Sequence, residues 1–184
     1  MALLRRRDDP HKLLVSMVGV QLGDRLVQIG CEHGARFAAI AGKVGLSGRA
    51  AVAVADESSA ARARRGTEEA GVLVELEVTP LTRLPLDDGA FDLAIVDNTA
   101  GLLGSLRPED RVAALREVLR VLRPAGRVMV IGAAPRGGLG ALLTRAASGP
   151  PFDPVPSLEA EGFRSARTLA EREGLTFAEA VKPR

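Results

Sequence analysis

Residues 25–34 end in a group of side chains and glycines that could bind a ligand. The first half of this stretch is apolar, as expected of a strand, and Gly30 and Gly34 then bracket the sequence Cys-Glu-His before a helical pattern begins. Such a turn is where open α/β sheets bind nucleotide-like ligands, because its backbone N–H groups and the helix N-terminus face the ligand. Glu32 adds a negative charge where a backbone-only loop would be expected. The turn therefore predicts a ligand site with unusual electrostatics.

Two side chains near this turn could act as general bases. One is His33, because histidine is the residue type that most often abstracts protons near neutral pH. Asp97 follows the apolar run 91–96, where the carboxyl end of a buried strand is expected, and Asn98 comes directly after it. Because ligands of open α/β sheets bind at the carboxyl ends of strands, we expect both residues to face the ligand. We also expect Asp97 to order its own loop.

Other chemistries fit the sequence poorly. Cys31 is the single cysteine, so a disulfide within the chain is impossible and its side chain is expected to pack in the core. A divalent cation at Asp97 would need further oxygen ligands, which residues 131–136 do not supply, so no metal site is predicted. The turn also lacks the glycine spacing of the dinucleotide fingerprint. Without Trp or Tyr, a pocket would be lined by apolar side chains such as Leu81, Leu84 or Leu102.

The elements that must position these residues alternate between short apolar runs and longer amphipathic segments. That alternation is typical of a parallel sheet with crossover helices. We expect strands at residues 26–29, 50–54, 72–78, 91–96 and 128–131. Helices are expected from Pro10 to Gly23, after Gly34, from Ser58 or Ser59 to Gly71, and from Pro108 to Leu122, with a short segment at 137–148. After a proline connector at 149–156, we expect a short helix at 157–161 and an antiparallel hairpin of 163–169 and 175–181, with a helical alternative for 169–173.

Composition limits the class of protein. The 184 residues, 46% hydrophobic and 26% charged, fit one soluble domain. The net charge of +2 gives no reason to expect a nucleic-acid partner. No apolar run approaches the roughly 20 residues that cross a bilayer, and the amino terminus does not resemble a signal peptide. We therefore expect no membrane association and a cytoplasmic location.

Three segments, at residues 27–34, 84–96 and 115–130, carry a family resemblance. In this order they resemble the class I S-adenosylmethionine-dependent methyltransferases, particularly the small methyltransferase type 11-like proteins that act on diffusible substrates. The resemblance covers about residues 23–182. It implies an α/β, Rossmann-like fold in which a seven-stranded, mostly parallel sheet has its last strand antiparallel and helices on both faces. We expect one domain, 1–184, with a leading helical segment (1–22), a cofactor-binding half (23–132) and a C-terminal segment with the closing hairpin (133–184).

The resemblance also implies a cofactor site. S-adenosylmethionine would be the cofactor, and His33 or Asp97 the base if one is needed. The implied cofactor-binding residues are Gly30, Cys31, Gly34, Asp56, Glu57, Leu81, Asp97 and Asn98.

Four positions depart from the family pattern. In the family, acids end the run before the glycine turn, end strand two to bind the ribose hydroxyls, and precede a Leu-Pro pair to contact adenine. By spacing these positions are Gln28, Val54 and Pro80, none of which is acidic. Glu32 replaces the family's middle glycine, and its charge would repel the cofactor's carboxylate unless Arg36 or a proton offsets it.

Asp56 and Glu57 follow the second expected strand. A two-residue shift of the loop would let them bind the ribose; otherwise they cap the next helix, whose N-terminus favours acids. Two functions therefore stay open. One is methyl transfer to an O, N or C nucleophile of an unidentified small molecule. The other is a methyltransferase-fold protein with weak or lost cofactor binding that acts as a binding or scaffolding subunit. Because few residues are left for a substrate cap, a homodimer or partner protein could complete the site.

Overall fold

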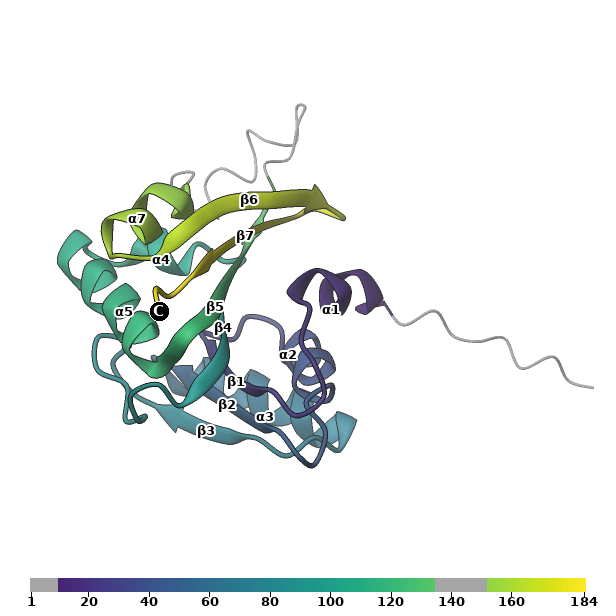
Figure 1. Cartoon of the computed structure of the whole chain (residues 1–184). Helices are drawn as coiled ribbons and strands as arrows, with labels where there is room; N and C mark the ends of the chain where they lie inside the picture. Colours follow the sequence, from purple (N-terminus) through teal and green to yellow (C-terminus); the bar gives the residue numbers. More distant parts are fainter. Residues whose placement is uncertain (1–9, 135–151) are drawn as a thin grey trace, which may run out of the picture.

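The computed structural model describes residues 10–134 and 152–184, and these contain one seven-stranded sheet in the order β3-β2-β1-β4-β5-β7-β6 (Figure 1). The strands are β1 (Arg25–Ile29), β2 (Arg49–Val54), β3 (Glu75–Val78), β4 (Phe91–Asn98), β5 (Leu122–Ala133), β6 (Arg164–Arg172) and β7 (Leu175–Val181). β1 to β5 are parallel, and β7 pairs antiparallel with both β5 and β6. The expected Rossmann-like sheet with its antiparallel last strand is confirmed.

Helices cover both faces of this sheet (Figure 1). They are α1 (Lys12–Val18), α2 (Gly34–Ala41), α3 (Glu57–Ala70), α4 (Leu102–Ser105), α5 (Pro108–Val121) and α7 (Pro154–Ala160). Side chains alternate along β1, so that Val27 and Ile29 join the core with α4, α5 and α7, whereas Leu26 joins the core with α1, α2 and α3. Because both faces are covered, the central strands are apolar almost throughout.

The strand order places the topological switch point of the sheet between β1 and β4. From β1 the chain moves outward through β2 and β3, and it then returns to β4 on the other side of β1. At such a switch point the loops after two neighbouring strands leave in opposite directions, which opens a ligand site at their carboxyl ends. Residues 30–34 and 97–101 lie at this edge.

Several expected boundaries were wrong for identifiable reasons. The leading helix ends at Val18 rather than Gly23, because Gly19 adopts a left-handed conformation (φ 64°) and Arg127 donates to the carbonyls of Val18 and Gly19. β3 begins at Glu75 because the chain first leaves α3 through Gly71, also left-handed. α4 was not predicted, and residues 137–148 lie outside the described part of the chain.

The C-terminal elements also differ from expectation. β5 begins at Leu122, directly after α5. Pro124 and Gly126 lie in this strand, where its pairing register with β4 shifts. α7 begins within the expected proline connector, since Pro154 occupies its first turn and Asp153 accepts a hydrogen bond from the N–H of Val155. The hairpin is confirmed, and the helical alternative for 169–173 is wrong because β6 continues to Arg172.

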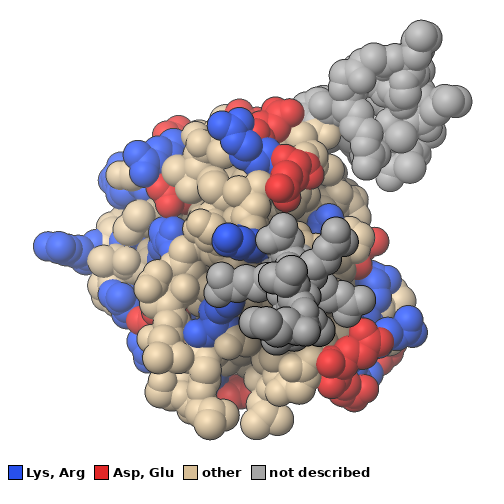
Figure 2. Space-filling model, turned by 90° about the vertical axis from the view of Figure 1, so that its right-hand side faces the viewer, with Lys and Arg blue, Asp and Glu red and all other residues tan. Residues whose placement is uncertain are grey.

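Charges are mixed over the surface. On the face in Figure 2, outside the undescribed atoms, basic and acidic side chains occur in small neighbouring groups. That face therefore carries no broad field of one sign, in keeping with the net charge of +2. Among the helices that the structure describes, none has the length and apolar character needed to span a membrane.

Candidate functional site

The turn after β1 is fixed from inside the sheet. Gly30 has a φ of 77°, a conformation that favours glycine, and its N–H donates to the carbonyl of Ala53 in β2 at 2.8 Å. Gln28 donates from Nε2 to the carbonyl of Gly30 at 2.9 Å, and this side chain is only 3% exposed. Gln28 therefore stabilises the turn through a hydrogen bond that a carboxylate at this position could not donate.

Asp97 joins the turns that follow β1 and β4. One of its carboxylate oxygens accepts the N–H of Glu32 at 2.8 Å, and the other accepts the N–H and the hydroxyl of Thr99 at 3.2 and 2.6 Å. The expectation that Asp97 orders its own loop is confirmed.

Asn98 positions the segment that lies over the glycine turn. Its Oδ1 accepts the N–H of Leu103 at 2.7 Å, and the residue is 8% exposed. The adjacent Leu102 reaches the turn closely enough that a Cβ added to Gly30 would lie 2.8 Å from its Cδ2. α4 thus brings an apolar side chain directly against Gly30.

Gly34 has a packing role that the sequence did not reveal. A Cβ added there would lie 1.9 Å from the carbonyl oxygen of Arg62, and one added to Gly66 would lie 2.1 Å from the carbonyl carbon of Gly34. The backbones of α2 and α3 touch at these two glycines. Gly34 is therefore needed where the helices cross, and this alone accounts for a glycine at the position.

Arg62, in α3, links that helix to the turn after β1. Its Nε donates to the carbonyl of Cys31 at 3.0 Å, and its NH2 lies 2.8 Å from the hydroxyl of Ser59 and 3.4 Å from a carboxylate oxygen of Glu32. The structure thus pairs Glu32 with Arg62 rather than with Arg36. Sequence reasoning missed Arg62, although Ser59, Arg62 and Gly66 share one helical face by spacing.

Asp56 is the N-cap of α3. Hydrogen bonds from the Ser58 hydroxyl and from the N–H and hydroxyl of Ser59 lower the pKa of Asp56 to about 2. The capping role considered for this residue is therefore observed. Glu57 is directed to solvent, 75% exposed, with an ion pair to Arg64 at 3.5 Å. Val54 is fully buried and does not face a ligand.

The remaining predicted residues are placed as follows. Cys31 is 3% exposed, and burial, together with the charge of Asp97, raises the pKa of its thiol to about 12, which keeps it protonated and unreactive. His33 is exposed at the start of α2, where its side chain makes no capping hydrogen bond. Leu81 is 5% exposed and packs in the core with Leu84.

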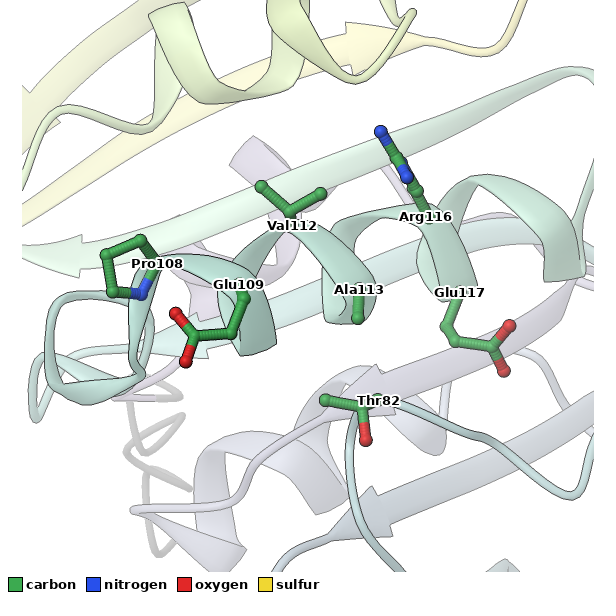
Figure 3. Close-up of a pocket in the computed structure, with 7 residues that line it drawn as sticks. All are labelled: Thr82, Pro108, Glu109, Val112, Ala113, Arg116 and Glu117. Carbon is green, nitrogen blue, oxygen red and sulfur yellow. The ribbon is translucent and has the colours of Figure 1, made fainter.

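A shallow groove of about 680 Å³ runs along α5, outside this group of residues. Figure 3 shows its lining on the helix and on the loop beside it: Thr82, Pro108, Glu109, Val112, Ala113, Arg116 and Glu117. None of the predicted site residues contributes to it. Among the residues that the structure describes, no three His, Cys, Asp or Glu side chains gather as metal ligands would.

Comparison with known proteins identifies the class. A family model described as "Methyltransferase domain" matches residues 27–130, and the chain belongs to this family. The sheet order and the glycine turn agree with that assignment, because the same fold occurs in the crystal structure of an S-adenosylmethionine-dependent methyltransferase from Aquifex aeolicus. The structural alignment covers 95% of this chain and 94% of the Aquifex chain, with a TM-score of 0.74 and 19% sequence identity.

Curated relatives carry methyltransferase names. Methyltransferase GfsG of Streptomyces halstedii is 27% identical over 136 residues, which are 74% of this chain and 47% of that protein. The ubiquinone/menaquinone biosynthesis C-methyltransferase UbiE of Idiomarina loihiensis is 28% identical over 115 residues, 61% of this chain and 44% of that protein. The chain spans less than half the length of these relatives.

Proposed function

We propose that this protein transfers a methyl group from S-adenosylmethionine to a nucleophilic O, N or C atom of a small molecule. The family assignment supports the reaction class. The observation that carries the proposal is the joining of the segments after three strands at the carboxyl edge of the sheet: Asp97 connects the turns after β1 and β4, and Arg62 connects the turn after β1 with α3, the helix that follows β2. These segments lie at the edge of the sheet where open α/β folds bind their ligands.

The residues at this edge fit the cofactor. The charge of Glu32, which would otherwise repel a carboxylate, is offset by Arg62. Asp56 lies just past β2 and caps α3 through Ser58 and Ser59; the acceptor capacity that its carboxylate keeps beyond these three hydrogen bonds would serve a ribose hydroxyl, which Val54 cannot do. Because the backbone of Gly30 is bonded to Ala53 and Gln28, it would shape the turn, while the backbones of Cys31 and Gly34 would face the amino-acid end. Asn98 and the apolar Leu81 would border the adenosine.

When bound, S-adenosylmethionine supplies an electrophilic methyl group whose carbon–sulfur bond breaks, with the electron pair leaving on the neutral thioether. The chain's own task is to exclude water and to hold the acceptor in line with that bond, which can provide most of the rate enhancement. If the acceptor must lose a proton, exposed His33 or Asp97 would take it.

Isothermal titration calorimetry with S-adenosylmethionine and S-adenosylhomocysteine tests this proposal. We expect saturable binding of both ligands. We also expect Asp56→Asn, which keeps a capping oxygen, to weaken both by about tenfold or more, since a hydrogen bond to a charged group contributes about 1.5–3 kcal/mol. Glu109→Gln, at an exposed ion pair on α5, is the matched control and should bind as the parent does.

Two results would count against it. Absence of heat and of a thermal shift at millimolar ligand would reject the enzyme and favour a scaffolding protein without cofactor. Equal affinity in the parent and Asp56→Asn would reject the ribose role of Asp56 alone.

The proposal also includes the molecule's wider setting. We infer a single methyltransferase-like domain, a cytoplasmic location and an acceptor side completed by a second copy or a partner protein. The mixed charge of the visible surface favours small molecules over nucleic acid as substrates. Sedimentation of the purified chain with and without S-adenosylhomocysteine would establish its oligomeric state.

A further inference from the structure

Glu32 and Arg62 place opposite charges side by side at the carboxyl edge of the sheet. Glu32 lies in the turn after β1, and Arg62 lies one turn into the helix after β2. Their side chains are 39% and 37% exposed, so both charges can be reached from solvent. Both residues are nevertheless held in place. The backbone N–H of Glu32 donates to Asp97, and the Nε of the Arg62 side chain donates to the carbonyl of Cys31.

The contact between the two charges is loose. The Arg62 NH2 and the nearest Glu32 oxygen are 3.4 Å apart, whereas charge-assisted hydrogen bonds in proteins are usually about 2.7–2.9 Å long. Within the described part of the chain, this is the one polar contact of the Glu32 carboxylate. Arg62 also keeps spare capacity, because its NH1 makes only a 3.4 Å contact with the Ser58 hydroxyl.

We propose that Glu32 and Arg62 together bind the amino-acid end of the cofactor as a zwitterion. The carboxylate of Glu32 accepts from the α-ammonium group, and the guanidinium of Arg62 donates to the α-carboxylate. A ligand that carries both charges on one carbon matches an adjacent, preorganised and loosely paired carboxylate and guanidinium. The inference depends on the proposed function, because it assigns two residues to one part of that cofactor.

This assignment gives a reason for the glutamate inside the turn. A carboxylate that met only the α-carboxylate of the ligand would weaken binding. Facing the α-ammonium instead, with Arg62 beside it, Glu32 adds an attraction and leaves the pair electrically neutral. If the pair only stabilised the turn, its removal would weaken the binding of every ligand of the site to the same extent.

Two ligands separate these roles. S-adenosylhomocysteine carries the amino-acid group, and 5′-methylthioadenosine has the same adenosine thioether without it. In calorimetric titrations of the folded chain, we expect Glu32→Gln to weaken S-adenosylhomocysteine by about tenfold and to leave 5′-methylthioadenosine unchanged. Arg62→Lys, which keeps the charge and loses the planar fork, should show the same selectivity. Glu109→Gln, which removes the carboxylate of an exposed ion pair with Arg107 on α5, is the matched control and should change neither affinity.

The other outcomes overturn the inference in distinguishable ways. An equal loss for both ligands would assign the pair a structural role, and an unchanged or tighter binding of S-adenosylhomocysteine to Glu32→Gln would reject the ammonium contact. If the parent chain binds neither ligand, the proposed function itself fails. Thermal unfolding of each variant, run in parallel, shows whether a loss of affinity reflects a loss of fold.

Discussion

At the scale of single residues, the polar groups near the site hold backbone. Gln28 is buried, with 3% of its surface exposed, and its amide N–H donates to the carbonyl of Gly30. By resemblance the family has an acid at this position, which could only accept. The chain has thus replaced an acceptor with a donor at the base of the turn.

Replacing Gln28 with Leu should lower the free energy of unfolding by about 1–3 kcal/mol, because the buried carbonyl of Gly30 loses its side-chain donor. Gln21→Leu is a matched control: Gln21 also donates to a backbone carbonyl, that of Gly19, but on the surface. Its effect should stay below about 0.5 kcal/mol. Urea denaturation measures both, and equal effects would show that burial of the Gly30 carbonyl carries no penalty.

At the scale of elements, the close crossing of α2 and α3 brings Arg62 to the glycine turn. The two helices meet backbone to backbone at Gly34 and Gly66, so the side chain of Arg62 reaches the carbonyl of Cys31. A wider crossing would move Arg62 away from Glu32. The helix contact and the charge pair are therefore coupled.

Gly66→Ala should destabilise the protein by about 1–3 kcal/mol. The new Cβ would lie within 2.1–2.7 Å of backbone atoms of Gly34 and Ala35, and this overpacking outweighs the roughly 1 kcal/mol that alanine gains in a helix. Arg65→Ala, on the exposed face of α3, controls for helix propensity and should change stability little. A thermal melt in which Gly66→Ala is more stable than the parent would contradict the close crossing.

Periodicity predicted most of these elements and few of their ends. The apolar runs of β1, β2 and β4 and the closing hairpin follow directly from residue pattern, and so does the family fold. The start of β5 was missed because Pro124 and Gly126 suggest a break, whereas the strand tolerates them where its pairing with β4 is irregular. Arg62 was missed because its contacts join residues about 30 positions apart, which no local pattern encodes.

At the scale of the whole molecule, Asp92 fastens the amino ends of the central strands. Its carboxylate accepts the N–H and guanidinium of Arg25, at 2.8 and 3.1 Å, and a hydrogen bond from Arg123. Burial acts to raise the pKa of Asp92, but the hydrogen bonds from Arg25 and Arg123 outweigh it and lower the pKa to about 2. A group with a depressed folded pKa stabilises the protein above its unfolded value, about 3.9 for Asp, and the contribution is lost as the pH falls through about 2.

Asp92→Asn should therefore reduce the free energy of unfolding by about 2 kcal/mol at pH 7. The difference from the parent should shrink below pH 4 and approach zero only below pH 2, where Asp92 of the folded parent is mostly protonated as well. Denaturant unfolding across this range measures it. Asp88→Asn serves as the control, because Asp88 is 80% exposed and should change stability by less than about 0.5 kcal/mol. A constant difference at all pH values would contradict the assignment.

The position of β7 also sets the order in which the molecule can be assembled. β7 lies between β5 and β6, pairs with β5 from Arg127 to Ala133, and buries Phe177 completely (Figure 1). A nascent chain that has left the ribosome only as far as residue 174 therefore exposes one edge of β5. In such a chain β6 has no strand to pair with, because β7 is its partner in the sheet. β1 to β5 can form beforehand, but two of the seven strands, β6 and β7, join the sheet only after the seven residues of β7 have been made. Until they arrive, the open edge of β5 is a surface that other unfinished chains could pair with.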